Sequence, residues 1–220
     1  AIGPKLKWIK SDMLIKKRLI VLFLISFLLS LLLVIKLNKD ILINSILLSF
    51  AFYLFFISLR DFFIKKKLSL SQNFAHFGFS LLILSILFNN ILSKEIITNL
   101  KVGEIYKSEK FEINFENIGQ VEKKNFKEVI GKFIIKDSED NIEILNPGLR
   151  IYNQPNIVTS EADIKVNLFE DKFMTMNYVP NQDYFNIRYQ IKPFMIWIWF
   201  SVLLITFGGI MSVFKKRYEN

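Results

Sequence analysis

The sequence contains no cysteine and a single histidine, His76, among its 220 residues. Without cysteine, the chain cannot hold disulfides, thiolate metal sites or a Cys-x-x-Cys-His haem attachment sequence of its own. One imidazole is also too few for a zinc site, which would need most of its ligands from elsewhere. Glycine counts only 8 residues, and no glycine-rich phosphate loop is present. Functions that depend on these motifs within the chain are therefore excluded.

Apolar residues dominate what is present. They make up 52% of the chain, the mean hydropathy is +0.33, and phenylalanine alone counts 23. These values favour a membrane protein with a soluble part over a water-soluble globule. Because the chain begins with Ala1 and not with Met, we expect the C-terminal part of a longer protein, either a fragment or one product of a split gene. Heavy use of Ile, Lys, Asn and Phe is typical of an AT-rich bacterial or organellar genome.

Long uncharged runs predict four transmembrane helices. They cover residues 19–35, 41–59, 70–92 and 194–214. The second run, at about 1.5 Å per residue, is about 28 Å long and crosses a hydrocarbon core. The basic head before the first run is similar to a signal peptide, but it has no small-residue cleavage site and a second span follows at once. We therefore interpret the first run as a membrane span.

The distribution of basic residues predicts the orientation. Lys and Arg count 6 in residues 1–18, 4 in residues 60–73 and 3 in the tail 215–220. Short basic loops stay on the cytoplasmic side, so these segments are predicted to be cytoplasmic, or on the matrix side of a mitochondrial inner membrane. Residues 93–193 carry 14 basic and 16 acidic residues and are predicted to lie on the periplasmic or intermembrane-space side. The net charge of +9 is then a matter of topology and lipid headgroups, with no implication of nucleic acid.

The outer segment 93–193 has the pattern of a β-rich domain. Apolar and polar residues alternate, or pair as a hairpin, over residues 111–116, 132–145, 163–168 and 184–191, and turn signals lie at 146–148, 154–156 and 180–183. Roughly six to eight short strands predict a small antiparallel sandwich or barrel. The fold class is thus an α+β membrane protein, with a β-rich extracytoplasmic domain inserted between the third and fourth helices. No nucleophile–base pair is readable in it.

His76 is the unusual feature of the third span. An ionisable ring at membrane depth is costly unless it has a partner, so by default it marks a functional site. Gln72 and Ser80 lie four positions away on a helix, where either could hydrogen-bond the ring and make it a structural residue.

A ligand role is the other interpretation. Neutral imidazole is a strong axial ligand for haem iron, and the three flanking phenylalanines suit a porphyrin. Ala75 and Gly78 are small and would let a second helix or a flat ligand approach closely. The residues alone leave both interpretations open.

Several short motifs resemble one family. They are Ala75-His76-Phe77-Gly78, Thr159-Ser160-Glu161-Ala162, Lys192-Pro193 followed by Trp197-Ile198-Trp199, Gly208-Gly209, the opening Gly3-Pro4-Lys5-Leu6-Lys7-Trp8, and Pro147 with Arg150 and Tyr152. In their order, with a β-rich segment before the last helix, the chain resembles the C-terminal third of CcmF. That family comprises the haem lyase membrane subunits of System I cytochrome c maturation. The resemblance spans nearly the whole chain.

The resemblance implies that His76 is an axial ligand of a b-type haem, which keeps the incoming haem iron reduced for attachment to apocytochrome c. Its second imidazole would come from an upstream helix, outside this chain. The family's tryptophan-rich WWD segment and its two other haem-binding histidines are also absent, so the chain would not be catalytic alone. The implied partners are the remainder of the lyase subunit, a haem chaperone and apocytochrome c.

Partner contacts and a rival function complete the expectations. Trp197 and Trp199 have the position of an interfacial aromatic belt, and with Arg150 and Glu161 they are candidates for partner contacts. The rival function is a cofactor-free assembly scaffold or chaperone that presents the β-domain from a membrane anchor. A transporter is disfavoured, because four helices with one ionisable group offer no evident substrate path.

Overall fold

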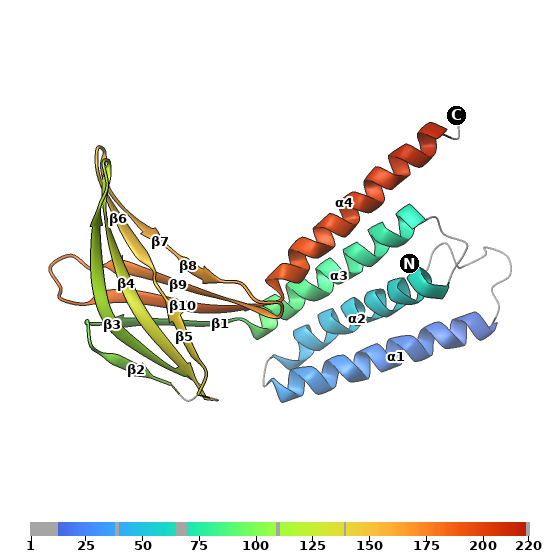
Figure 1. Ribbon diagram of the computed structural model, residues 1–220. Coiled ribbons are helices and arrows are strands. Elements are labelled where there is room, and N and C mark those ends of the chain that lie inside the picture. The colour runs from blue at the N-terminus through green and yellow to red at the C-terminus, as the bar shows by residue number, and fades with distance from the viewer. Residues whose placement is uncertain (1–12, 38–39, 65–69, 109–110, 139, 219–220) are drawn as a thin grey trace. The chain divides into compact units, whose positions relative to one another are not determined.

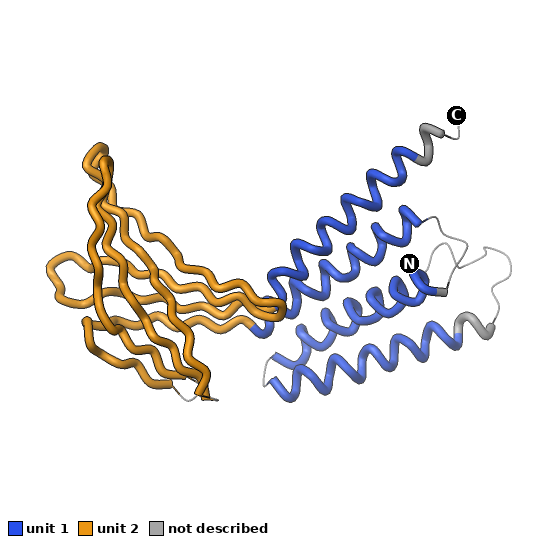
Figure 2. Tube along the Cα trace, viewed as in Figure 1, with its two compact units in different colours: residues 1–92, 194–220 blue, residues 93–193 orange. Residues whose placement is uncertain are grey.

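The computed structural model describes residues 13–37, 40–64, 70–108, 111–138 and 140–218 (Figure 1). The chain forms two compact units (Figure 2). The first contains the helices and comprises Ala1–Leu92 and Phe194–Asn220, whereas the second contains the strands and comprises Ser93–Pro193. The opening motif with Trp8 lies outside the described residues.

Four helices of the described chain are long and apolar enough to cross a membrane. They are α1 (Met13–Lys36), α2 (Ile41–Ile64), α3 (Leu70–Leu92) and α4 (Met195–Tyr218). This agrees with the four predicted spans. The helix α2 continues past residue 59 to Ile64, and Arg60 and Asp61 form an ion pair of 3.2 Å within its last turns. The charged residues that ended the predicted uncharged run thus lie inside the helix.

Serines join neighbouring spans. Ser30 on α1 donates a hydrogen bond of 3.0 Å to the carbonyl oxygen of Ser45 on α2. On the other side of α2, the hydroxyl groups of Ser58 and Ser80 are hydrogen-bonded, which links α2 to α3. In lipid, apolar helices gain little from the hydrophobic effect when they pack together. Hydrogen bonds between helices therefore help to fix which faces are in contact.

Small residues bring α3 and α4 close together. A Cβ atom on Gly208 would lie 2.7 Å from the backbone nitrogen of Ala75 and from the carbonyl oxygen of Ser71. A Cβ on Gly78 would lie 2.9 Å from the carbonyl oxygen of Ser201 on α4. The two helices therefore touch backbone to backbone, as small residues permit.

We expect Gly208→Ala to push α4 away from α3 and to destabilise the helical unit by about 1–3 kcal/mol, the usual cost of overpacking. The matched control is Gly209→Ala, because a Cβ there meets nothing within 4 Å. Denaturation of the purified protein in detergent, followed by loss of helical circular dichroism, measures both variants. Equal stability of the two variants would contradict the packing described here.

The second unit is a β-sandwich, which agrees with the predicted sandwich or barrel. One sheet has the order β1-β10-β9-β8, and the other has the order β2-β3-β4-β6-β7 with β5 paired to β4. The strands are β1 (Lys94–Leu100), β2 (Ile105–Lys107), β3 (Phe111–Glu122), β4 (Phe126–Asp137), β5 (Ile142–Leu145), β6 (Gly148–Asn153), β7 (Asn156–Glu161), β8 (Asp163–Lys165), β9 (Glu170–Tyr178) and β10 (Phe185–Pro193). All pairings given by the register are antiparallel.

The core of the sandwich follows the period-2 pattern. Phe115 and Phe133 are cross-strand partners, and their rings stack with centroids 4.2 Å apart. Met174 and Met176 of the facing sheet are fully buried in the same cluster. One predicted strand is shorter than its pattern: β8 ends at Lys165, and residues 166–169 form an exposed turn.

Candidate functional site

His76 lies on an exposed face of α3, six residues after the helix begins, or about 9 Å along its axis. Gln72 and Phe79, one turn on either side, are exposed as well. Among the described residues, no hydrogen bond or ion pair reaches the imidazole ring. Ser80 bonds to α2 and to the carbonyl oxygen of Phe77. The structural interpretation through Ser80 therefore finds no support.

Ala75 and Gly78 lie on a different side of the helix. Gly78 is two residues, or about 200°, away from His76 around the axis, and it is buried against Ser201 and Ile205 of α4. Ala75 packs against Gly208. The sequence predicted that either a second helix or a flat ligand would approach these small residues closely. In the structure, the helix α4 does so. Packing against α4 accounts for their small size without a cofactor.

The phenylalanines around His76 divide into two groups. Phe74 and Phe77 pack inward against Phe62 of α2, with ring centroids 5.2 and 5.6 Å apart. Phe79 instead is 55% exposed and shares the face of His76. The helix thus presents an imidazole and an apolar aromatic ring side by side on a surface that the described residues leave exposed.

That surface is compatible with a haem group on the chemistry of its side chains. Haem iron accepts an imidazole nitrogen as an axial ligand, and the porphyrin ring favours apolar surroundings. His76 supplies one such nitrogen, and Phe79 supplies apolar surface on the same face. A second imidazole is absent from the sequence. This chain can therefore provide half of a bis-histidine site.

The tryptophans lie in the first turns of α4. Trp199 is 65% exposed, and the ring of Trp197 contacts Phe200 edge to face at 6.1 Å. Phe194, just before the helix, stacks on Phe88 of α3 with centroids 5.1 Å apart. Both tryptophans thus sit at one end of a membrane span, as in an aromatic belt.

Arg150 and Glu161 belong to one charged cluster on the outer face of the six-stranded sheet. Arg150 Nη1 lies 3.1 Å from Glu161 Oε1, and Arg150 Nε lies 3.0 Å from Glu128 Oε1. Lys123 Nζ lies 3.1 Å from the other oxygen of Glu128. The Arg150 guanidinium also lies 5.1 Å from the centre of the Phe126 ring. These hydrogen bonds, from Lys123 first and Arg150 second, hold the pKa of Glu128 below its ordinary value.

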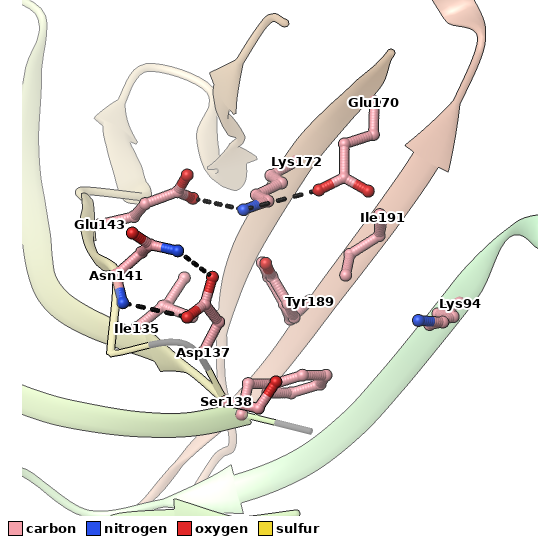
Figure 3. A pocket seen from close by; sticks show the side chains of 11 residues that line it. Lys94, Ile135, Asp137, Ser138, Asn141, Glu143, Glu170, Lys172, Tyr189 and Ile191 are labelled. Carbon is pink, nitrogen blue, oxygen red and sulfur yellow. Dashed lines mark hydrogen bonds and ion pairs between the residues drawn. The ribbon is translucent and has the colours of Figure 1, made fainter.

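A polar cavity of about 430 Å³ opens between the ends of the two sheets (Figure 3). Lys172 Nζ lies between Glu143, at 2.9 Å, and Glu170, at 3.6 Å. Burial, with the charges of Glu143, Glu170 and Asp137, raises the pKa of the Tyr189 hydroxyl far above its usual range. The ionisable groups that line the cavity are therefore the Lys172 ion-pair cluster, the neutral phenol of Tyr189, Lys94, and Asp137, which accepts hydrogen bonds from Asn141. They do not form an activated nucleophile.

Sequence reasoning missed both the cavity and Glu128. Lys172 and Glu143 are distant in sequence, and only the pairing of β9 with its neighbours and of β5 with β4 brings their strands to one end of the sandwich. Glu128 looks like any acid on a solvated strand, yet it is 9% exposed. Only its cross-strand partner, Arg150 on β6, could have indicated that Glu128 is buried in an ion pair, and that partner is known only once the strand register is known.

The comparisons with known proteins point in one direction. Residues 91–193 match the family model described as the CcmF C-terminal beta-sandwich. The cytochrome c-type biogenesis protein CcmF of Pseudomonas fluorescens is 27% identical over 145 residues, which cover 66% of this chain and 22% of that protein. CcmF of Escherichia coli K12 is 22% identical over 228 residues, which cover 100% of this chain and 35% of that protein.

The solved structure of a protein named Cytochrome c Heme Lyase CcmF has the same fold. Its TM-score is 0.69 at 17% identity, over 95% of this chain and 36% of that one. The chain thus spans about a fifth to a third of the relatives that it matches.

Proposed function

Because the chain belongs to the CcmF family and corresponds to the C-terminal third of its members, we propose that it is part of the membrane subunit of a cytochrome c haem lyase. In this function His76 is one axial ligand of a b-type haem. The second ligand comes from the upstream part of the subunit or from a split-gene partner. The β-sandwich lies outside the inner membrane of a bacterium, or of a mitochondrion, and positions haem and apocytochrome c.

The observation that carries this proposal is the exposed, intramembrane His76. Among the described residues the ring has no polar partner, and a polar group in lipid without one is costly. A ligand from outside the chain removes that cost. When bound, the haem supplies one-electron chemistry. His76 would hold the iron through one ring nitrogen, and Phe79 would provide apolar surface beside it.

The remaining partners follow from the same family. They are the rest of the lyase subunit, a haem chaperone and apocytochrome c, and the chain is not catalytic without them. Trp197 and Trp199 are placed for contacts at the membrane surface. Arg150 and Glu161 bind each other, so a partner would meet them as one cluster.

The test is to express this chain with the upstream part of the subunit, purify the complex and record its reduced-minus-oxidised spectrum. We expect a b-type band from the complex and none from either part alone. A colourless complex that still supports assembly of c-type cytochromes would favour the rival function, a cofactor-free scaffold.

A further inference from the structure

The turn between β8 and β9 exposes a cluster of apolar side chains. Val166, Leu168 and Phe169 are 60%, 55% and 63% exposed. Ile164, Val166 and Leu168 alternate with polar residues, which is the pattern that normally buries one side of a strand. Here β8 stops at Lys165, so that pattern lies in a turn instead. Neighbouring apolar side chains left open in this way mark a surface that meets something apolar.

Strand register places this turn at one particular end of the sandwich. Glu170, the first residue of β9, pairs with Pro193, the last residue of β10. One strand further, Ile191 pairs with Lys94 at the start of β1. The turn therefore projects from the end of the sheet where β1 begins and β10 ends, as Figure 1 shows.

Both links to the membrane spans leave from that same end. Lys94 is the second residue after α3, and Pro193 is the second residue before α4. Two residues span at most about 7 Å. At this end of the sandwich, both β1 and β10 are therefore within two residues of a candidate membrane span along the chain.

Both basic and acidic residues lie at this end of the sheet. Lys165 ends β8, Lys192 lies next to the last residue of β10, and Lys94 begins β1. The two acidic residues that follow the turn are engaged within the sandwich, since Glu170 pairs with Lys172 at 3.6 Å and Asp171 accepts a hydrogen bond of 3.3 Å from the backbone nitrogen of Asn167. Apolar side chains with lysines nearby are typical of segments that lie in a membrane interface.

We propose that residues 166–169, the β8–β9 turn, insert into the outer interface of the lipid bilayer and anchor the sandwich to the membrane surface. Phe169, Leu168 and Val166 lie among the upper acyl chains, and the neighbouring lysines contact lipid phosphates. This third attachment, beside the two chain links, restrains rotation of the sandwich about them. The inference is independent of haem.

Nitroxide labels measure the depth of the turn, and the absence of cysteine makes single labels simple. The variants Leu168→Cys and Phe169→Cys, labelled and reconstituted as the full chain into phosphatidylethanolamine–phosphatidylglycerol vesicles, report contact with oxygen and with a water-soluble nickel chelate. The control is Tyr178→Cys, at the other end of β9, about 26 Å away and 54% exposed.

We expect the labels at 168 and 169 to favour oxygen over nickel, at a depth of roughly 5–10 Å, while the label at 178 favours nickel. Equal nickel contact at 169 and 178 overturns the proposal, because the turn is then in water. Exclusion of both reagents from the turn overturns it as well, because protein then covers these side chains. The exposed positions leave the sandwich core untouched, which circular dichroism verifies.

Discussion

Replacing His76 with alanine is expected to remove most of the b-type haem from the complex between this chain and the upstream part of its subunit. Loss of an outer-shell partner of a ligand already costs roughly 10–100-fold in metal affinity, so loss of the ligand itself should cost at least as much. The protein should still insert, because His76 is exposed and makes no hydrogen bond or ion pair to another helix among the described residues. Pyridine haemochrome analysis of the purified complex measures the haem content.

A matched control separates the ligand from the helix surface. Ile86→Ala changes another exposed residue of α3, ten residues or about 15 Å further along, and should keep the haem. Added imidazole should restore the absorbance of the His76→Ala complex, because a free imidazole can occupy the vacated axial position. Haem that survives in His76→Ala without imidazole would refute the ligand assignment.

Much of this architecture is predictable, because its patterns are local. The four spans follow from uncharged length, and strands such as β3 and β10 follow from alternation along one short segment. The spans and strands are each read from one short segment. The resemblance to CcmF, in contrast, rests on motifs that are weak alone but ordered along the chain.

The parts that escaped prediction depend on distant neighbours. Whether Gly78 faces a ligand or a helix is decided by α4, more than a hundred residues later in the chain. Which face of α3 leaves His76 open depends on where α2 and α4 pack. Residues 166–168 continue the alternating pattern of a strand, but they form a turn, because the pairing of β8 with β9 ends at Lys165. Local sequence patterns predict which segments are helices and strands. Which of their side chains are buried depends on the elements that pack against them.

Arg150 is a further case that depends on distant neighbours. Its sequence context suggested a contact with a partner protein, whereas in the fold its guanidinium forms an ion pair with Glu128. The carboxylate of Glu128 accepts bonds from Arg150 and Lys123 on a sheet face where only 9% of its surface is exposed. Removal of its charge leaves the guanidinium with one carboxylate partner, Glu161. Glu128→Gln therefore tests how much the charge of this cluster contributes to the stability of the sandwich.

We expect Glu128→Gln to destabilise the sandwich by about 2 kcal/mol at neutral pH, the scale of a hydrogen bond to a charged group. Because the pKa of Glu128 is lower in the folded state than its ordinary 4.5, its contribution is complete above that value and is lost as the pH falls through the folded pKa. The difference in unfolding free energy between wild type and variant should therefore disappear in acid.

Glu116→Gln is the control, since Glu116 makes a 2.6 Å ion pair with Lys132 on the same sheet, where both side chains are well exposed. An exposed pair contributes about 0–1 kcal/mol, so this variant should stay close to wild type. Hydrogen exchange of the β4, β6 and β7 amides, measured from neutral to acid pH, reports both variants. A gap that persists unchanged in acid would mean that shape, and not the charge of Glu128, carries the effect.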